Sequence, residues 1–185
     1  MITTKKQIKE VLKAEKDFYL SKHSKFQRII TLDSTYVLYR YIRNLRKLEY
    51  YYNNRKNVFN LIMYVLCRRK RNILGRKLGV EMHPNNFDAG LKIWHTGNII
   101  VNPHAKIGKN CVLHGDNCIG NNGKDDAAPV LGDNVRLGVG AKVLGDVKLA
   151  NNVTVAAGAV VIHSCEQENA VLAGVPAKCV KIAGE

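Results

Sequence analysis

Hydrophobic and polar positions follow a period of six residues through the second half of the chain. A branched aliphatic residue returns at each sixth position, apart from one slot lost at Asp125, in the series Val101, Ile107, Leu113, Ile119, Leu131, Leu137, Val143, Leu149, Val155 and Val161. Neither a helix (period 3.6) nor a simple strand (period 2) keeps this spacing. A parallel β-helix does, because each hexad forms one short strand and a turn. The pattern predicts a triangular coil with the aliphatic residues stacked inside.

The first 78 residues have a different pattern, with apolar residues at helical spacing. This segment contains no proline, and its apolar stretch near residue 60 becomes basic over residues 68–71. We expect three or four helices over residues 1–78. His83-Pro84 prevents continuation of a helix, so a β-helix is expected over 79–165. A tail over 166–185 is expected to leave the coil and fold back along it.

Positive charge is confined to the N-terminal part. Residues 1–80 contain 20 Lys and Arg against 5 Asp and Glu, whereas the remainder contains 9 against 10. Nucleic acid, an anionic membrane surface and a phosphate-bearing substrate each fit this charge. A solvated helical face fits it equally well, and composition alone leaves these alternatives open.

Cysteine usage and the N-terminus indicate a cytoplasmic protein. The five cysteines have no paired spacing, which argues against a disulfide framework and a zinc knuckle. The N-terminus is polar and lysine-rich, unlike a signal peptide, and no apolar run is long enough to cross a bilayer. The histidines lack the spacing of paired metal ligands, so no metal is expected. The basic helices are a candidate for peripheral contact with the inner face of a membrane.

Three further stretches accompany the hexads: KIWHTGNIIVNPHAKIG (92–108), LGVGAKVLGD (137–146) and AGVPAK (173–178). Together they resemble the hexapeptide acyltransferases, and specifically the serine O-acetyltransferases with their relatives that acetylate sugars and polysaccharides. This resemblance implies a left-handed β-helix and acetyl-CoA as the co-substrate. It also implies a homotrimer with active sites between subunits.

The resemblance implies that His95 is the catalytic base. It would remove the proton of an acceptor hydroxyl, which is a poor nucleophile at neutral pH. Glu81 matches the acidic residue that orients this histidine in the family, with one residue deleted between them. In a strict six-residue register, however, His95 falls on an inward slot six positions before Val101. A buried core histidine is therefore the alternative.

The resemblance also implies where acetyl-CoA binds. Small residues allow its amide-bearing arm to approach the backbone, and Lys178 matches a basic position near the phosphates. The implied cofactor positions are Gly120, Gly138, Val139, Ala156, Ala157 and Lys178. The small residues are equally expected at tight turns of a β-helix.

Departures from the family pattern bear on the acceptor. Trp94 replaces an aspartate that precedes the histidine in serine acetyltransferases, and Ala127-Ala128 replaces an Arg-His pair. The flat apolar ring of Trp94 suits a sugar ring. We therefore expect Trp94, His114 and Asp116 to bind a sugar, with the loop 120–130 lying over it. The leading prediction is an O-acetyltransferase for a sugar or surface-polysaccharide precursor. Serine acetylation is the alternative, and a non-catalytic basic scaffold or nucleic-acid-binding protein is a third.

Overall fold

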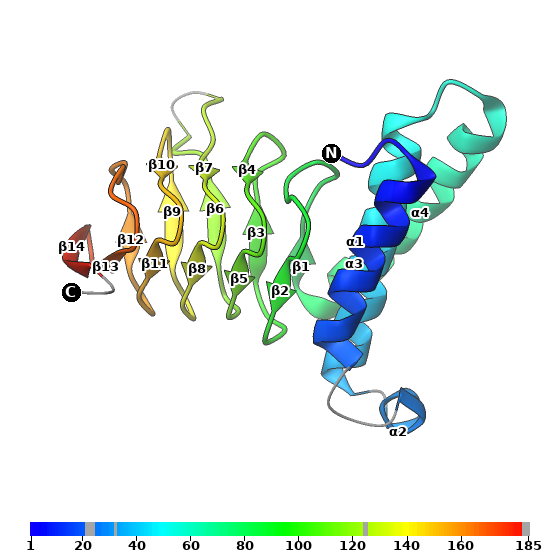
Figure 1. The fold of residues 1–185 in the computed structure, drawn as a ribbon, viewed down its shortest axis with the longest axis horizontal. Helices are drawn as coiled ribbons and strands as arrows, with labels where there is room; N and C mark the ends of the chain where they lie inside the picture. Colours follow the sequence, from blue (N-terminus) through cyan, green and yellow to red (C-terminus); the bar gives the residue numbers. More distant parts are fainter. Residues whose placement is uncertain (21–24, 32, 124–125, 183–185) are drawn as a thin grey trace.

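The computed structural model describes residues 1–20, 25–31, 33–123 and 126–182. A layer of helices lies across one end of an elongated β-helix (Figure 1). The described residues form four helices, as expected: α1 (Lys5–Leu20), α2 (Lys25–Ile30), α3 (Ser34–Asn53) and α4 (Val58–Leu78). None of the described helices combines the length and apolar character needed to span a membrane.

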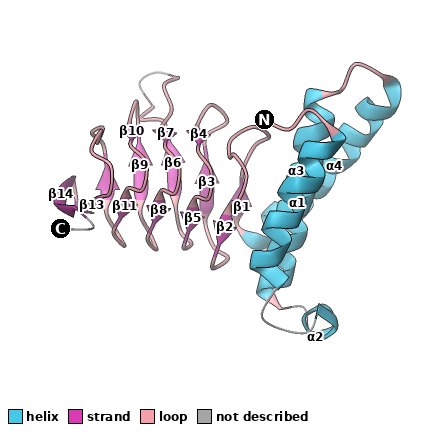
Figure 2. Cartoon of the chain, viewed as in Figure 1, coloured by secondary structure: helices cyan, strands magenta, loops and turns pink. Residues whose placement is uncertain are grey.

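Short strands build three sheets, which form the faces of the coil (Figure 2). The orders are β1-β3-β6-β9-β12, then β10-β7-β4, then β14-β13-β11-β8-β5-β2, and the predicted left-handed parallel β-helix is confirmed. The strands are β1 (Val80–Glu81), β2 (Lys92–Ile93), β3 (Ile99–Val101), β4 (Lys106–Ile107), β5 (Val112–Leu113), β6 (Cys118–Gly120), β7 (Val130–Leu131), β8 (Arg136–Leu137), β9 (Lys142–Leu144), β10 (Lys148–Leu149), β11 (Thr154–Val155), β12 (Val160–Val161), β13 (Ala170–Gly174) and β14 (Ala177–Ile182).

The aliphatic residues of the six-residue series line the interior. All ten are buried, with at most 4% of any residue exposed. Leu137 lies beside Val155, 18 residues later, but Leu113 and Leu137 are 24 residues apart, because the chain leaves the coil between β6 and β7. The lost slot at Asp125 falls in this excursion, outside the described residues. Each buried side chain contributes roughly 1.5–3 kcal/mol, so the interior fixes the register.

Tyr19 of α1 caps the outer edge of the third sheet. β2 is the last strand of that sheet, so its outward backbone groups have no further strand to bind. The Tyr19 hydroxyl accepts a hydrogen bond from the Ile93 N–H at 2.9 Å and donates to the Leu91 carbonyl at 3.4 Å. Burial raises the pKa of Tyr19, which keeps the phenol neutral and able to do both. Helix α1 thereby holds the strand that leads into Trp94 and His95.

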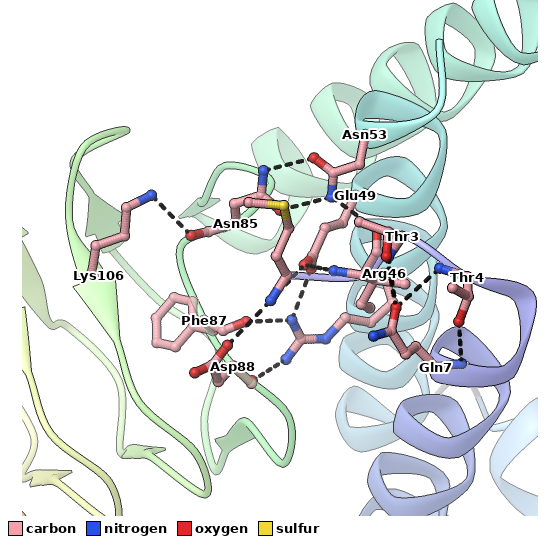
Figure 3. A network of polar contacts seen from close by, with 12 residues as sticks. Thr3, Thr4, Gln7, Arg46, Glu49, Asn53, Asn85, Phe87, Asp88 and Lys106 are labelled. Atoms are coloured by element: carbon pink, nitrogen blue, oxygen red, sulfur yellow. Dashed lines mark hydrogen bonds and ion pairs between the residues drawn. The ribbon is translucent and has the colours of Figure 1, made fainter. Parts of the chain in front are cut away.

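Arg46 of α3 caps the edge next to β4 (Figure 3). Its Nη1 donates to the Phe87 carbonyl at 2.7 Å, and its Nη2 donates to the Asp88 carbonyl at 2.6 Å. The carboxylates of Glu15 and Glu49 lie 2.7 Å and 3.1 Å from the same two nitrogens. Burial by itself would lower the pKa of Arg46. The negative charges and hydrogen bonds of the two carboxylates have the larger effect, so the pKa is raised. A buried guanidinium is tolerated here because it is paired and hydrogen-bonded.

Helices α3 and α4 cap the remaining edge, which is formed by β1. Arg71 Nη1 donates to the Met82 carbonyl at 2.9 Å, and the Tyr41 hydroxyl donates to the Val80 carbonyl at 3.5 Å. Gly75 permits this close packing of α4, since a Cβ there would collide with the Val80 oxygen. Side chains from the helices therefore close all three faces of the first coil.

The predicted C-terminal tail begins later than expected. The chain does not leave the coil at residue 166, because β13 adds a parallel strand to the end of the third sheet, with Leu172 beside Val155. Ala170 and Leu172 are buried, so they extend the apolar interior by one more rung. β14 then pairs antiparallel with β13 and forms the last strand of that sheet.

Candidate active site

His95 lies in a turn that is longer than its counterpart in the next coil. Ile93 and Val101 both point inward and are eight positions apart, whereas their neighbours Leu113 and Ile119 are six apart. The two additional residues push the backbone of residues 94–98 out of the coil, and His95 is exposed. The alternative of a buried core histidine is therefore wrong, because the strict register does not continue through this turn.

Trp94 stands beside His95 and is supported from two sides. Its ring meets the Phe18 ring of α1 edge-on, with centroids 5.4 Å apart, and the His114 ring at 6.2 Å. Trp94 nevertheless remains 49% exposed. An indole that is fixed at its edges but open on its surface can bind a flat or apolar part of a ligand.

His114 and Asp116 lie in the corresponding turn of the second coil, next to His95. Gly115 allows this approach, since a Cβ there would lie 3.3 Å from Cβ of His95. Partial burial lowers the pKa of His114, and the nearby charges of His95 and Arg136 lower it further. The lowered pKa favours the neutral form of His114 beside His95. Asp116 is exposed on the same edge.

The third and fourth coils continue this edge with small residues. Gly140 N–H donates to the Gly115 carbonyl at 3.0 Å, Gly138 N–H to the Val155 carbonyl at 2.8 Å, and Gly158 N–H to the Val139 carbonyl at 2.8 Å. Gly138 is required for this contact, because a Cβ would lie 2.6 Å from the nitrogen of Ala157. Val139 and Ala157 are exposed, and Gly138 and Ala156 are partly exposed.

Lys178 lies at the far end of the same edge. Ala156 N–H donates to the Leu172 carbonyl at 2.8 Å, which places β13 directly beyond the fourth turn. Lys178 in β14 pairs with Ala173 in β13, and its side chain is exposed. One edge of the coil therefore carries an imidazole at one end, an ammonium at the other, and small residues between them.

Two predicted site residues lie away from this edge. The Glu81 carboxylate is 64% exposed, and its Oε1 lies 3.7 Å from Nε2 of His83. Among the described residues, no hydrogen bond or ion pair joins Glu81 to His95. Gly120 lies at a different corner, between β6 and β7, where its carbonyl accepts from the Gly145 N–H at 2.9 Å.

Two residues of the site were missed in the sequence. Asn117 is 1% exposed; its Oδ1 accepts from the Gly115 N–H at 3.0 Å and its Nδ2 donates to the Gly138 carbonyl at 2.7 Å. Asn117 lies six residues after Cys111, at a position of the repeat that is otherwise taken by small or β-branched residues. A polar residue at this buried position was the signal present in the sequence. Phe18 gave no such signal, because its role depends on how α1 docks. The described residues contain no group of three or more His, Cys, Asp or Glu side chains that could hold a metal ion.

Comparison with known proteins adds an independent observation. Residues 128–163 match the family model "Bacterial transferase hexapeptide (six repeats)". The chain is 32% identical over 127 residues to a serine acetyltransferase of Staphylococcus aureus strain Mu50, an alignment that covers 67% of the chain and 59% of that protein. It is 32% identical over 109 residues to the serine acetyltransferase of Synechococcus elongatus, covering 57% of the chain and 44% of that protein.

Solved structures give the same fold. Serine acetyltransferase from Brucella abortus superposes with a TM-score of 0.77 at 21% identity, over 97% of this chain and 71% of that one. The soybean apoenzyme has a TM-score of 0.74 at 21% identity, over 95% of this chain and 69% of that one. The chain spans about 59% of the length of the Staphylococcus relative. These similarities, together with the stacked hexads, show that the chain belongs to the hexapeptide-repeat acyltransferases, in the group that includes the serine acetyltransferases.

Proposed function

We propose that the protein is an acetyl-CoA-dependent O-acetyltransferase with His95 as its general base. A ring nitrogen of His95 takes the proton of the acceptor hydroxyl while the oxygen attacks the thioester carbonyl. The C–S bond then breaks, and the CoA sulfur leaves as a thiolate that takes up a proton. The observation that carries this proposal is the alignment of His95, the small-residue turns and Lys178 along one edge. Holding both substrates there supplies much of the rate.

The edge suits acetyl-CoA in length and chemistry. The turns at His95, His114, Gly138 and Ala156 occupy successive coils, so the first and the fourth are about 14 Å apart at ~4.8 Å per coil. The small residues Gly138, which is partly exposed, and Ala157, which is exposed, permit close approach of an amide-bearing chain. Lys178 would meet the phosphates, for which a flexible ammonium is suited. Two of the related solved structures, one of them from Brucella abortus, are complexes with CoA.

Serine is the better-supported acceptor. The related proteins and structures named above are serine acetyltransferases, so the similarities favour the serine alternative over the sugar acceptor expected first. One specific observation keeps a sugar as the second candidate. Trp94, half exposed beside His95, presents an apolar surface where those enzymes are expected to carry an aspartate.

Glu81 is kept as a proposed orienting residue, since β1 pairs with β3, the strand that follows the His95 turn. Its carboxylate must leave His83 to act in this way. Glu81→Gln is then expected to lower kcat without changing the KM for acetyl-CoA.

We further propose a cytoplasmic homotrimer in which the edge faces a neighbouring subunit and Gly120 lies toward that neighbour. Light scattering of the purified protein tests the trimer.

The test of function is an acceptor panel. Release of the CoA thiol from acetyl-CoA is measured with L-serine, with neutral hexoses and with nucleotide sugars, each with wild type and His95→Ala. Serine acetylation predicts release with L-serine alone, and a sugar acceptor predicts release with one of the saccharides. Thiol release that persists at the wild-type rate in His95→Ala would reject the assigned base.

A further inference from the structure

A cleft of about 500 Å³ lies between the second half of α4 and the first coil. Arg68, Arg71 and Arg76 line it from the helix, and Glu81, His83 and Asn98 line it from the coil. A second cavity of about 250 Å³ shares Arg68, Arg71 and His83 with the first. The two cavities therefore meet at the same basic side chains.

Positive charge in the cleft is not neutralised by the protein. Among the described residues, no carboxylate lies within ion-pair distance of Arg68, Arg71 or Arg76. Glu81 is the acidic residue in the lining, and its Oε1 is 3.7 Å from His83. Three guanidiniums therefore face a cavity that contains one carboxylate. Elsewhere in the same helical layer, by contrast, Arg46 is paired with two carboxylates.

Arg71 is fixed in position and incompletely bonded. It is 8% exposed, and its Nη1 donates to the Met82 carbonyl at 2.9 Å. Its buried Nε has no hydrogen-bond partner within the described structure. An unpaired buried charge of this kind is costly unless a counter-ion compensates it. A planar guanidinium held by one backbone bond is well prepared to bind an oxyanion.

We infer that this cleft is an anion-binding site, which takes a phosphate group, free or as part of a phosphate ester. It is separate from the proposed CoA-phosphate position, because Lys178 lies in the last strand and the cleft borders the first. It is nevertheless joined to the His95 turn: Asn98 lines the cleft, and Gly97 N–H donates to the Leu78 carbonyl at 3.1 Å. A phosphate bound there belongs either to an acceptor or to a free anion that modulates the enzyme.

The first arm of the test measures binding without turnover. Inorganic pyrophosphate is titrated into the protein, and the imidazole of His83 is followed by NMR in histidine-labelled material. Burial lowers the pKa of His83, and the charges of Arg71 and Arg68 lower it further. A bound anion opposes those charges, so the pKa of His83 is expected to rise as the site saturates. The His83 resonance is assigned with His83→Gln.

Matched variants separate this site from general charge attraction. Arg68→Gln/Arg76→Gln removes two exposed charges that line the cleft, and pyrophosphate affinity is expected to fall by about tenfold or more. Arg69→Gln/Lys77→Gln removes two exposed charges of the same helix outside the cleft, and the change is expected to stay within about twofold. Equal losses in both variants, or a His83 resonance that does not respond, would overturn the site.

The second arm identifies the source of the phosphate and rests on the proposed function. Pyrophosphate that competes with the acceptor but not with acetyl-CoA assigns the cleft to the acceptor. Inhibition or activation that is independent of acceptor concentration assigns it to a free anion. If the protein transfers no acetyl group, the binding arm still decides whether the site exists.

Discussion

The same corner of the coil is built in two ways. In the first coil, six residues connect Ile93 to Ile100, whereas four connect Leu113 to Cys118, the partner of Ile100, in the second. The longer turn carries Trp94 and His95. The turns of the third and fourth coils, 138–141 and 156–159, consist of Gly, Ala and one Val, and their backbones bond directly to neighbouring coils.

This difference separates two tasks along one edge. Regular turns expose backbone and small side chains, so they form a surface on which a long ligand can lie. The longer turn moves His95 from an inward position of the strict register to the exposed edge of the coil. The longer turn lies in the first coil, which has no further coil on its outer side. There the hydroxyl of Tyr19 in α1 accepts the backbone hydrogen bond of Ile93 instead.

The largest expected effect comes from removing the histidine side chain of the turn in the first coil. His95→Ala is expected to lower kcat for transfer by about 100- to 10,000-fold, because a general base is lost. The KM for acetyl-CoA should change little, since the small-residue turns are intact. Steady-state thiol release measures both constants. His104→Ala, at an exposed position in another turn, is the control and should retain activity.

The next effect tests the support that the helices give to the first coil. Arg46→Ala leaves Glu15 and Glu49 buried without their partner and removes two caps from backbone carbonyls. The free energy of unfolding is expected to fall by about 3–5 kcal/mol. Urea denaturation at fixed protein concentration measures it. Arg43→Ala on the exposed side of α3 should stay within about 0.5 kcal/mol, and an equal loss there would contradict the cap.

A smaller effect is expected from the regular turns. Ala157→Leu places a bulky side chain on the exposed small-residue surface and should raise the KM for acetyl-CoA by about tenfold, or about 1.4 kcal/mol. Its kcat should stay near that of wild type, which is the reverse of His95→Ala. Lys148→Leu on another face of the coil provides the control. A fall in kcat with unchanged KM would mean that the two kinds of turn are not functionally distinct.

The smallest effect concerns pH and the cleft beside the first coil. Burial, with help from Arg71, lowers the pKa of His83 in the folded protein, although Glu81 opposes this shift. The unfolded chain therefore binds a proton at higher pH than the folded one. The stabilisation is complete above about pH 6.5 and is lost as pH falls through the lowered pKa. Partial burial lowers the pKa of His114 as well, so this residue acts in the same direction.

Denaturation curves between pH 5 and 8 measure this loss. His83→Gln should flatten the profile, whereas His163→Gln at an exposed position should keep the wild-type pH dependence. A wild-type profile that rises as pH falls over this range would have the wrong sign for a partly buried His83 whose pKa is lowered.

The repeat could be predicted from sequence because it is local. Each hexad repeats the same relation between side chain and interior, so Leu137 and Val143 are buried as expected. Counting inward slots failed at His95, where two extra residues change the register. The caps could not be foreseen, because Tyr19 and Arg46 contact the coil through a docking geometry that leaves no periodic signal. The Glu81 carboxylate lies beside His83 and not beside His95. The spacing of these residues in the sequence does not reveal which histidine Glu81 contacts.

The number of coils fixes the separation of the two ends of the edge. A duplicated 18-residue coil between β8 and β11 would keep the pattern of inward residues and the helical caps on the first coil. It would nevertheless move Lys178 about 4.8 Å farther from His95. The number of coils therefore sets the length of ligand that the edge can span. This length changes only by the spacing of one coil, about 4.8 Å.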